Sequence, residues 1–265
     1  MSIPEKTISS LGQLIDAVTP QEPSPASGRR RDTGVYHGSS SVRHPLLTTL
    51  DRLGGSNPPH TKAHLEEHIL RNFGRYSRPN LMTQPTNDWE VLVIAQHHGV
   101  PTRLLDWSYS PLVAAHFATC HAHPGDDVVV WRLDWQRIHR MFSLPDIAFR
   151  IEDLLELDVT DGAEPFTPWR LFGGLNRSFA CMIEPPSLDG RIVAQAATFT
   201  ICTDTSKSFE SFLADHDLDD ALARYVIPHE HVPHVRDQLD LAGVDERRLF
   251  PDLSGVAASV RRYYA

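Results

Sequence analysis

The stretch Gln96-His97-His98-Gly99-Val100-Pro101-Thr102-Arg103-Leu104-Leu105-Asp106-Trp107 is the most informative part of this chain. It holds two imidazoles, an amide, a hydroxyl, a guanidinium, a carboxylate and an indole around one Gly-x-Pro turn. A structural segment rarely needs so many different polar groups, whereas a binding site can use each of them on a different part of a ligand. The stretch therefore predicts a binding site.

The elements around this stretch follow from hydrophobic spacing and from residues that begin or end helices. A helix over 88–98 places Trp89, Leu92 and Val93 on one side and ends at Gly99. A short strand over 102–107 follows, and proline at the first turn favours a helix over 111–119. We expect further strands at 34–38, 127–133, 178–184, 191–202 and 223–227, and further helices at 61–73, 135–142, 146–155, 233–242 and 255–264.

Helices dominate this prediction before residue 125 and strands dominate after it, which indicates an α+β architecture. The Pro- and Ser-rich segment over 20–25 is typical of a flexible linker. We therefore expect residues 1–33 to form a flexible leader and residues 34–265 to form a single domain.

Composition narrows the class of protein. The 265 residues carry 34 acidic and 25 basic side chains, a formal charge of −9, which argues against a broad nucleic-acid face but allows a local basic patch. Three scattered cysteines make no disulfide framework. No apolar run reaches the roughly 18 residues of a membrane helix, and no signal peptide is recognisable. We expect a cytoplasmic protein with no membrane partner.

Fifteen histidines raise the question of a metal site. The residues His116, Cys120, His121 and His123 have spacings that zinc ligands can use, but they match no established pattern and end at a loop. The histidines at 229, 231 and 234 stand among prolines and are typical of a solvated turn. We expect no metal.

Two other stretches combine polar residues with small ones at a predicted strand end. In the first, Tyr36-His37-Gly38-Ser39-Ser40, an imidazole beside glycine can approach a ligand closely. In the second, Gln195 lies within the strand expected over 191–202. The structural alternatives are an ordinary strand-to-turn transition and a solvated glutamine. For Arg103 and Asp106 the alternative is a buried pair, but an offset of three places them on opposite faces of one strand, so at least one needs another partner.

Together these stretches resemble the FRG domain family, named after a Phe-Arg-Gly motif. The resemblance rests on 96–107, on the run from Ser110 to Ala118, on Arg191-Ile192-Val193-Ala194-Gln195 with Phe199-Thr200, and on Leu249-Phe250-Pro251-Asp252-Leu253. It spans nearly everything from about residue 34 to 262. The chain has Tyr36-His37-Gly38 where the family has Phe-Arg-Gly, and Gln195-Ala196 where the family has Gln-Gly. His-Gly-Ser is similar to the first motif of the poly-ADP-ribose polymerase and diphtheria-toxin branch.

FRG domains are similar to ADP-ribosyltransferases, and that resemblance implies an α+β fold of the ADP-ribosyltransferase type. In such a fold a split β-sandwich grips NAD and the helices pack outside. The resemblance implies NAD as substrate, with His37, Asp106 and Gln195 as catalytic residues. It also implies a binding set of Tyr36, Gly38, Ser39, Gln96, His97, Thr102, Arg103, Trp107, Ser108, Tyr109 and Ser110.

Within this hypothesis each group has a place on NAD. His37 would hold the adenosine ribose, with Gly38 letting the backbone approach, and Arg103 would hold the pyrophosphate as a fork of donors. Ser108 or Ser110 would contact nicotinamide, with Tyr109 or Trp107 stacked on its ring. Gln195 would hold the nicotinamide ribose, and Asp106 would supply the acid that a glutamine at 195 lacks.

The predicted activity is mono-ADP-ribosyl transfer from NAD to an unidentified acceptor, either a protein or a nucleic acid. Three alternatives remain at this point. The chain can be a non-catalytic sensor of NAD or another nucleotide, which a glutamine in place of the transferase glutamate favours. It can also be an NAD glycohydrolase, or an interaction module in which the polar motif only holds a turn.

Overall fold

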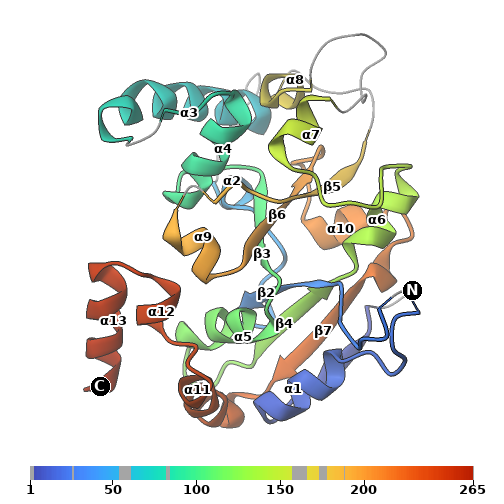
Figure 1. The fold of residues 1–265 in the computed structure, drawn as a ribbon, viewed down its shortest axis with the longest axis vertical. Helices are drawn as coiled ribbons and strands as arrows, with labels where there is room; N and C mark the ends of the chain where they lie inside the picture. The colour runs from blue at the N-terminus through green and yellow to red at the C-terminus, as the bar shows by residue number, and fades with distance from the viewer. Residues whose placement is uncertain are drawn as a thin grey trace.

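The computed structural model describes residues 3–25, 27–53, 61–81, 84–156, 166–172, 178–187 and 189–264. Seven strands form one sheet with helices on both sides (Figure 1). Neighbouring strands are antiparallel except for the outer pair, β1 and β7. In their order across the sheet the strands are β1 (Glu5–Thr7), β7 (Leu222–Ile227), β4 (Val128–Leu133), β2 (Val35–Ser39), β3 (Leu104–Ser108), β6 (Ala197–Cys202) and β5 (Ala180–Ile183).

The sheet opens between its two central strands. β2 pairs with β4 along its whole length and β3 pairs with β6 along its whole length, but β2 and β3 share only the register pair Tyr36–Ser108. Two half-sheets, β1-β7-β4-β2 and β3-β6-β5, therefore diverge from one point of contact. The mixed helix-and-strand class is as predicted. The two small sheets expected of a split β-sandwich are here two halves of one seven-stranded sheet, because the single pair Tyr36–Ser108 joins them.

The helices cover both faces. α5 packs on β2 and β4, with α11 and α1 beside it. On other parts of the sheet α9 packs on β6 and α6 packs on β5, while α12 and α13 pack on each other near α11 (Figure 1). The α-helices are α1 (Leu11–Val18), α2 (Thr49–Arg52), α3 (Lys62–Ser77), α4 (Asp88–His97), α5 (Pro111–Cys120), α6 (Trp135–Met141), α7 (Ile151–Leu155), α8 (Pro168–Phe172), α9 (Gly190–Ala194), α10 (Phe209–Ala214), α11 (Val232–Leu241), α12 (Glu246–Leu249) and α13 (Leu253–Tyr263). The 3-10 turns are η1 (Arg78–Asn80), η2 (Asp219–Ala221) and η3 (His229–His231).

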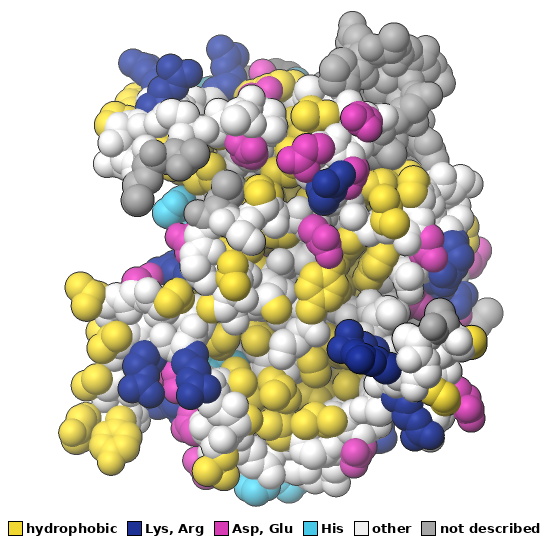
Figure 2. Space-filling view, viewed as in Figure 1, with side chains coloured by type: hydrophobic (Ala, Val, Ile, Leu, Met, Phe, Trp, Pro, Cys, Tyr) yellow, Lys and Arg dark blue, Asp and Glu magenta, His cyan; other side chains and the backbone are white. Residues whose placement is uncertain are grey.

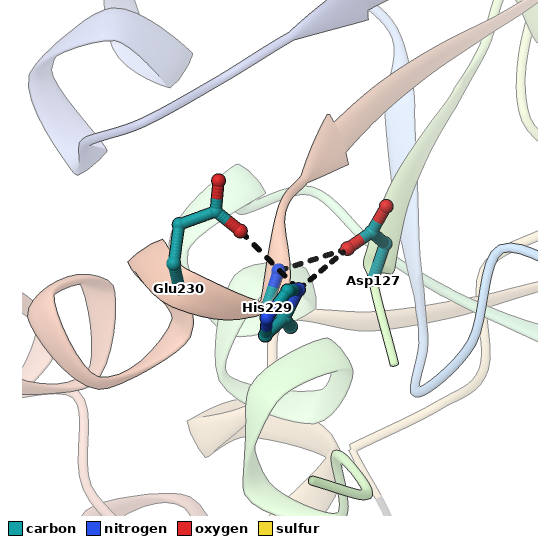
Figure 3. Close-up of side chains that lie close together, drawn as sticks. All are labelled: Asp127, His229 and Glu230. Carbon is teal, nitrogen blue, oxygen red and sulfur yellow. Dashed lines mark hydrogen bonds and ion pairs between the residues drawn. The ribbon is translucent and has the colours of Figure 1, made fainter. Parts of the chain in front are cut away.

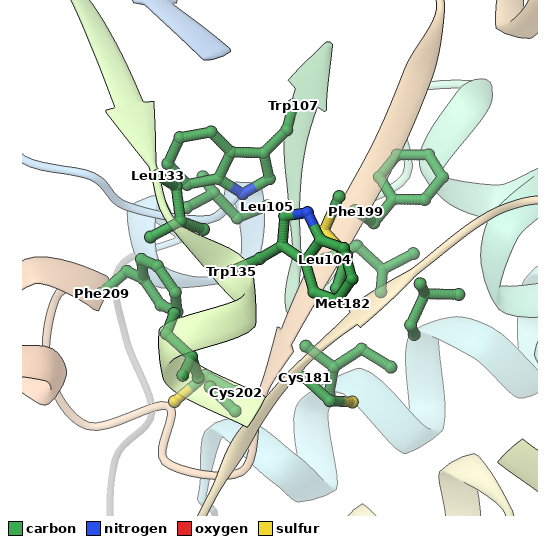
Figure 4. Close-up of a cluster of buried hydrophobic side chains, with 14 of the residues drawn as sticks. Leu104, Leu105, Trp107, Leu133, Trp135, Cys181, Met182, Phe199, Cys202 and Phe209 are labelled. Carbon is green, nitrogen blue, oxygen red and sulfur yellow. The ribbon is translucent and has the colours of Figure 1, made fainter. Parts of the chain in front are cut away.

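Two hydrophobic clusters occupy the two faces of the sheet. Along β4, Val128 and Val130 point to the cluster beneath α5, while Val129 and Leu133 point to the larger cluster on the opposite side. This alternation is what a strand with a side-chain period of two requires when both faces are covered. Figure 4 shows part of the larger cluster, to which β3 contributes Trp107, β4 contributes Leu133 and β6 contributes Phe199.

The N-terminal residues differ from the expected flexible leader. Residues 5–7 form β1, which adds to the sheet edge beside β7, and Ser10 caps α1 by accepting from the backbone N–H of Gln13. The α1 side chains Leu11 and Leu14 are buried against α11 and α5. A strand of three residues is too short to show a period in the sequence, so only its pairing partner reveals it.

The segment 191–202 also differs from prediction, because only its second half is a strand. Asp189 caps α9 by accepting from the backbone N–H of Arg191, and Gln195 ends that helix. Ala196 then adopts a positive φ of 45°, which turns the chain into β6. The other predicted elements are present with shifted ends. Within the described ranges no helix is both long and apolar enough to cross a bilayer.

Candidate functional site

A pocket of about 400 Å³ lies where β2 and β3 separate. Its walls come from β2, β3, α2, α4, α5 and α9 and from the segment that follows α12. Ten of the predicted site residues line it: Tyr36, His37, Gly38, Ser39, Gln96, His97, Asp106, Trp107, Ser108 and Gln195. The opening in the sheet thus brings together three segments that are far apart in the sequence.

His37 bridges the gap between the two half-sheets. Its Nδ1 lies 2.8 Å from the backbone carbonyl oxygen of Asp106, one step beyond the last backbone pair. Because a carbonyl can only accept, Nδ1 carries the proton and Nε2 keeps a lone pair. Burial lowers the pKa of His37, and the charge of Arg52 lowers it further, so the ring is neutral at pH 7. The ring also packs edge-on against Trp107, with centroids 5.8 Å apart.

Asp106 presents a carboxylate to the pocket. Gln96 Nε2 donates to its Oδ2 at 2.8 Å, and Gln96 Oε1 accepts from the Thr102 hydroxyl at 2.6 Å. Thr102 is buried behind this relay and acts by orienting Gln96, so it does not line the pocket. Burial raises the pKa of Asp106, while the Gln96 hydrogen bond and the charge of Arg52 lower it. The two hydrogen bonds of Gln96 fix the Asp106 carboxylate at the edge of the pocket through its Oδ2.

Gln195 and Ser108 join α9 to β3. The Ser108 hydroxyl donates to the backbone carbonyl of Gln195 at 2.7 Å, and the Gln195 side-chain Nε2 donates to the carbonyl of Leu249 at 3.1 Å. No described residue donates to Gln195 Oε1. The amide is therefore fixed by its nitrogen, with an acceptor oxygen left for a ligand hydroxyl. Gln195 sits at the end of α9, one residue before the turn into β6, and so is not borne by a strand as expected.

His97 lies at the end of α4 and faces α9. Its Nε2 is 3.3 Å from Asp189 Oδ2, and burial lowers its pKa against the pull of that carboxylate. The Asp189 carboxylate also caps α9. His97 thereby ties the predicted helix–turn–strand stretch to the helix that carries Gln195.

Arg103 was predicted to hold a pyrophosphate, but the structure places it outside the pocket. Its side chain is 1% exposed, and its Nε donates to Glu66 Oε2 at 2.6 Å. The backbone N–H of Arg103 donates to the other oxygen of the same carboxylate at 2.8 Å. Arg103 anchors α3 to the start of β3 and has no path to a pocket ligand.

Three aromatic or hydroxyl residues of the same region are also committed elsewhere. Tyr109 donates its hydroxyl to Glu184 at 2.6 Å and does not line the pocket. Ser110 caps α5 by accepting from Val113, and it too lies outside the lining. Trp107 borders the pocket, but its indole nitrogen donates to Thr200 at 3.0 Å, and the ring packs against Phe209. These contacts fix the orientation of the Trp107 indole, which is almost fully buried at the pocket wall.

Gly38 and Tyr36 have structural reasons for their identity. A Cβ on Gly38 would lie 2.0 Å from the carbonyl oxygen of Ala114, so glycine is needed for α5 to pack on β2. This close approach is to a helix and not, as expected, to a ligand. The Tyr36 hydroxyl donates to Asp32, whose carboxylate also accepts from Arg132 Nε at 2.8 Å. Tyr36 therefore supports the floor of the pocket.

Sequence reasoning missed two arginines that line the pocket. Arg52, at the end of α2, is exposed and pairs with no carboxylate among the described residues. Arg191 lies over the Phe250 ring at 5.4 Å and donates from Nε to Asp252 at 3.0 Å. Arg52 stands in a segment with no periodic signal, so only its place in the fold marks it as a site residue.

Of the histidines considered as metal ligands, His116 in α5 has another partner. His116 is buried in α5, and its Nδ1 accepts from Arg236 at 3.0 Å. Among the described residues, Asp127, His229 and Glu230 could share one ion (Figure 3). His229 Nδ1 lies 3.4 Å from Asp127 and 3.2 Å from Glu230, and the side chains are largely exposed. The trio lies outside the pocket lining.

Comparison with known proteins bears on the central part of the chain. No curated protein and no solved structure matches it. The family model described as the FRG domain matches residues 32–127, a range that includes β2, the stretch 96–107 and α5. Residues 32–127 are therefore similar to the FRG domain family.

Proposed function

We propose that the chain is an NAD-dependent mono-ADP-ribosyltransferase and that the pocket between β2 and β3 is its NAD site. One observation carries the proposal: His37, Asp106 and Gln195, from three distant segments, line the same pocket at the opening of the sheet. The ADP-ribosyltransferase resemblance expects these three positions to share one ligand. Their convergence supports that expectation without depending on their spacing in the sequence.

The chemistry of the lining suits a dinucleotide. A volume of about 400 Å³ lies within the usual range for small-molecule sites. Arg52, which pairs with no carboxylate in the described part of the chain, can supply the guanidinium that a diphosphate needs, the role expected of Arg103. His37 Nε2 can accept from a ribose hydroxyl, and Gln195 Oε1 can accept from a hydroxyl of the other ribose.

In the proposed reaction, the bond between ribose C1′ and the nicotinamide nitrogen breaks, and its electron pair leaves with nicotinamide. Positive charge develops at C1′, where the Asp106 carboxylate stabilises it. An acceptor oxygen or nitrogen then bonds to C1′, and its proton passes to Asp106. The acceptor is a protein or a nucleic acid. Water in the same place would make the reaction NAD hydrolysis.

A second candidate, a non-catalytic NAD or nucleotide sensor, is favoured by one observation. The position that would carry a carboxylate in a transferase holds the amide of Gln195, which donates to Leu249. An amide can fix a ribose but cannot supply a charge. The sensor and the transferase share the pocket and differ in whether nicotinamide is released.

The proposal is tested by calorimetric titration with NAD followed by an assay for released nicotinamide. We expect wild-type protein to bind and to release nicotinamide. Arg52→Gln should weaken binding about tenfold or more, because it removes a charge-assisted hydrogen bond. Arg137→Gln is the matched control, since it removes one exposed arginine at Asp220, outside the pocket. Binding without release identifies a sensor, and absence of NAD binding refutes the transferase and the NAD sensor.

A further inference from the structure

Three arginines share the exposed face at the end of α3. Arg71, Arg75 and the first residue of η1, Arg78, are spaced by four and three residues, which places them on one side of the helix. All three side chains are exposed. In Figure 2, dark-blue side chains gather at the upper left over α3. The chain has a formal charge of −9, so this face is a positively charged patch on an acidic protein.

Little in the described structure neutralises these charges. Glu67 lies 3.8 Å from Arg71, an exposed pair of small energetic worth. Arg75 and Arg78 pair with no carboxylate among the described residues. The nearby acids are engaged otherwise, since Asp88 accepts from the Trp169 indole and Glu90 accepts from the backbone of Thr86 at 2.6 Å. The face is therefore available to an anionic partner.

The same arginines border a groove that also contains aromatic rings. The groove, of about 730 Å³, is lined by Arg71, Arg75 and Arg78 together with Phe73 and Trp169. Beside it, Tyr76 is 66% exposed, and the Arg75 guanidinium lies over its ring at 5.1 Å. Guanidinium groups that meet phosphates, next to rings on which bases stack, are the usual pattern of single-strand binding.

One helix connects this groove to the pocket. Asp88 and Val91, in the first turns of α4, line the groove, and Gln96 and His97, at its end, line the pocket. Nine helical steps separate Asp88 from His97, about 14 Å along the axis. A few nucleotides of extended single strand are long enough to span that separation.

We propose that the face formed by Arg71, Arg75 and Arg78, with its groove, binds single-stranded nucleic acid, DNA or RNA, as the acceptor of the transferred group. The acceptor role rests on the proposed function, whereas binding of the strand does not. Single strands fit better than duplex because unpaired bases can stack on the rings and extend to a pocket. The tests below also distinguish a strand acceptor from a protein or acidic-peptide acceptor.

The binding test measures fluorescence anisotropy of labelled 20-nucleotide single-stranded DNA and RNA, without NAD. The variant Arg71→Gln, Arg75→Gln, Arg78→Gln should lower affinity about tenfold or more. It should also reduce the slope of log K against log salt by about 2, because each lost single-strand phosphate contact removes about 0.7. The control is Arg137→Gln, Arg140→Gln, Arg247→Gln, which removes the same charge from other surfaces.

Equal losses in the two triple variants would show a response to net charge alone and would overturn the binding face. Absence of single-strand binding would overturn it as well, and so would equal or tighter binding of duplex DNA or polyglutamate. The preference between DNA and RNA identifies which strand the groove takes.

The acceptor role is tested with labelled NAD and the bound strand. We expect label on the strand with wild-type protein and much less with the triple variant of Arg71, Arg75 and Arg78. Nicotinamide release by that variant without a strand should stay unchanged. Release with no label on the strand would overturn the acceptor assignment and leave the transferase proposal intact. Strand binding with no nicotinamide release would instead refute the transferase proposal and the acceptor role with it.

Discussion

The Asp106 side chain is exposed at the open pocket, where partial desolvation and the charge of Arg52 shift its pKa in opposite directions. Burial raises the pKa of Asp106, and Arg52 together with the Gln96 hydrogen bond lowers it. A carboxylate with a raised pKa is costly for the fold at neutral pH but suited to take a proton from an acceptor. That direction of the pKa shift suits the role proposed for Asp106.

We expect Asp106→Asn to raise the thermal unfolding midpoint at pH 7 only slightly, because water screens an exposed carboxylate, and to abolish nicotinamide release. A group whose folded pKa lies above its unfolded value destabilises the folded state while it is charged, so removing the charge removes that cost. The difference in unfolding midpoint between variant and wild type should close as the pH falls below about 4, where Asp106 is protonated in the folded and the unfolded protein. Parallel melts and release assays measure both effects. A lower midpoint for the variant at pH 7 would contradict the electrostatic reading.

Arg103 and Arg52 show which residue roles a sequence can settle. The spacing of Arg103 and Asp106 correctly predicts that they do not pair across one face of β3. It does not predict Glu66, 37 residues earlier, as the partner of Arg103. Both arginines carry the same charge in the sequence, but only the fold buries the first and leaves the second facing the pocket.

At the scale of elements, the contact between β2 and α5 places the first motif against the rest of the site. Gly38 lies under the α5 backbone, where a Cβ would stand 2.0 Å from the Ala114 carbonyl and 2.6 Å from the Ala118 nitrogen. A backbone cannot move aside as a flexible side chain can, so the helix itself would have to shift. The His37 ring, one residue before Gly38 on β2, would lose its place relative to α5 if the helix shifted.

Gly38→Ala should therefore destabilise the protein by about 2–3 kcal/mol or more, as overpacking in a close-packed interior does. Gly12→Ala in α1 is the matched control, because its Cβ would meet only Ser10 Oγ, at 3.9 Å. That control should stabilise by about 0.5–1 kcal/mol, since alanine loses less backbone entropy in a helix. Urea unfolding gives both values. A Gly38→Ala effect no larger than that of the control would refute the packing argument.

Elements with a clear period were predictable and elements set by a cap were not. The apolar run over 127–133 appears as β4, and the Ser110-Pro111 start appears as α5. The strand expected over 191–202 fails because Asp189, outside that window, caps a short helix, and Ala196 turns the chain. A cap acts through one backbone hydrogen bond, which leaves no repeating pattern to detect.

At the scale of the whole molecule, a buried polar cluster joins the C-terminal helices to α5. Arg236 on α11 donates to His116 at 3.0 Å and to Glu246 of α12 at 2.6 Å. Arg262 on α13 donates to the same glutamate at 3.0 Å. Phe250 and the Leu249 carbonyl, which follow directly from this cluster, meet the pocket and Gln195. The cluster therefore holds one wall of the pocket.

Burial, then the charge of Arg236, lowers the pKa of His116 to about 4, so the folded protein keeps it neutral where the unfolded chain takes up a proton. Stability should fall as the pH drops from about 6.5 towards 4. Between pH 7 and 5 this histidine should contribute a loss of about 2 kcal/mol. Urea unfolding at both pH values should show that loss reduced by about that amount in His116→Gln, which keeps an acceptor for Arg236. An unchanged loss in the variant would contradict the assignment.

The sequence by itself determined the main periodic elements, the mixed helix-and-strand class and the three segments that line the pocket. These depend on local spacing, capping and turn chemistry, which a short window contains. Only the tertiary structure decided that β1 extends the sheet, that the sheet opens between β2 and β3, and that Arg52 faces the pocket in place of Arg103. The physical reason is that strand pairing, burial and ion pairing join residues tens to hundreds of positions apart. Their energies depend on which surfaces meet, and local composition does not encode that.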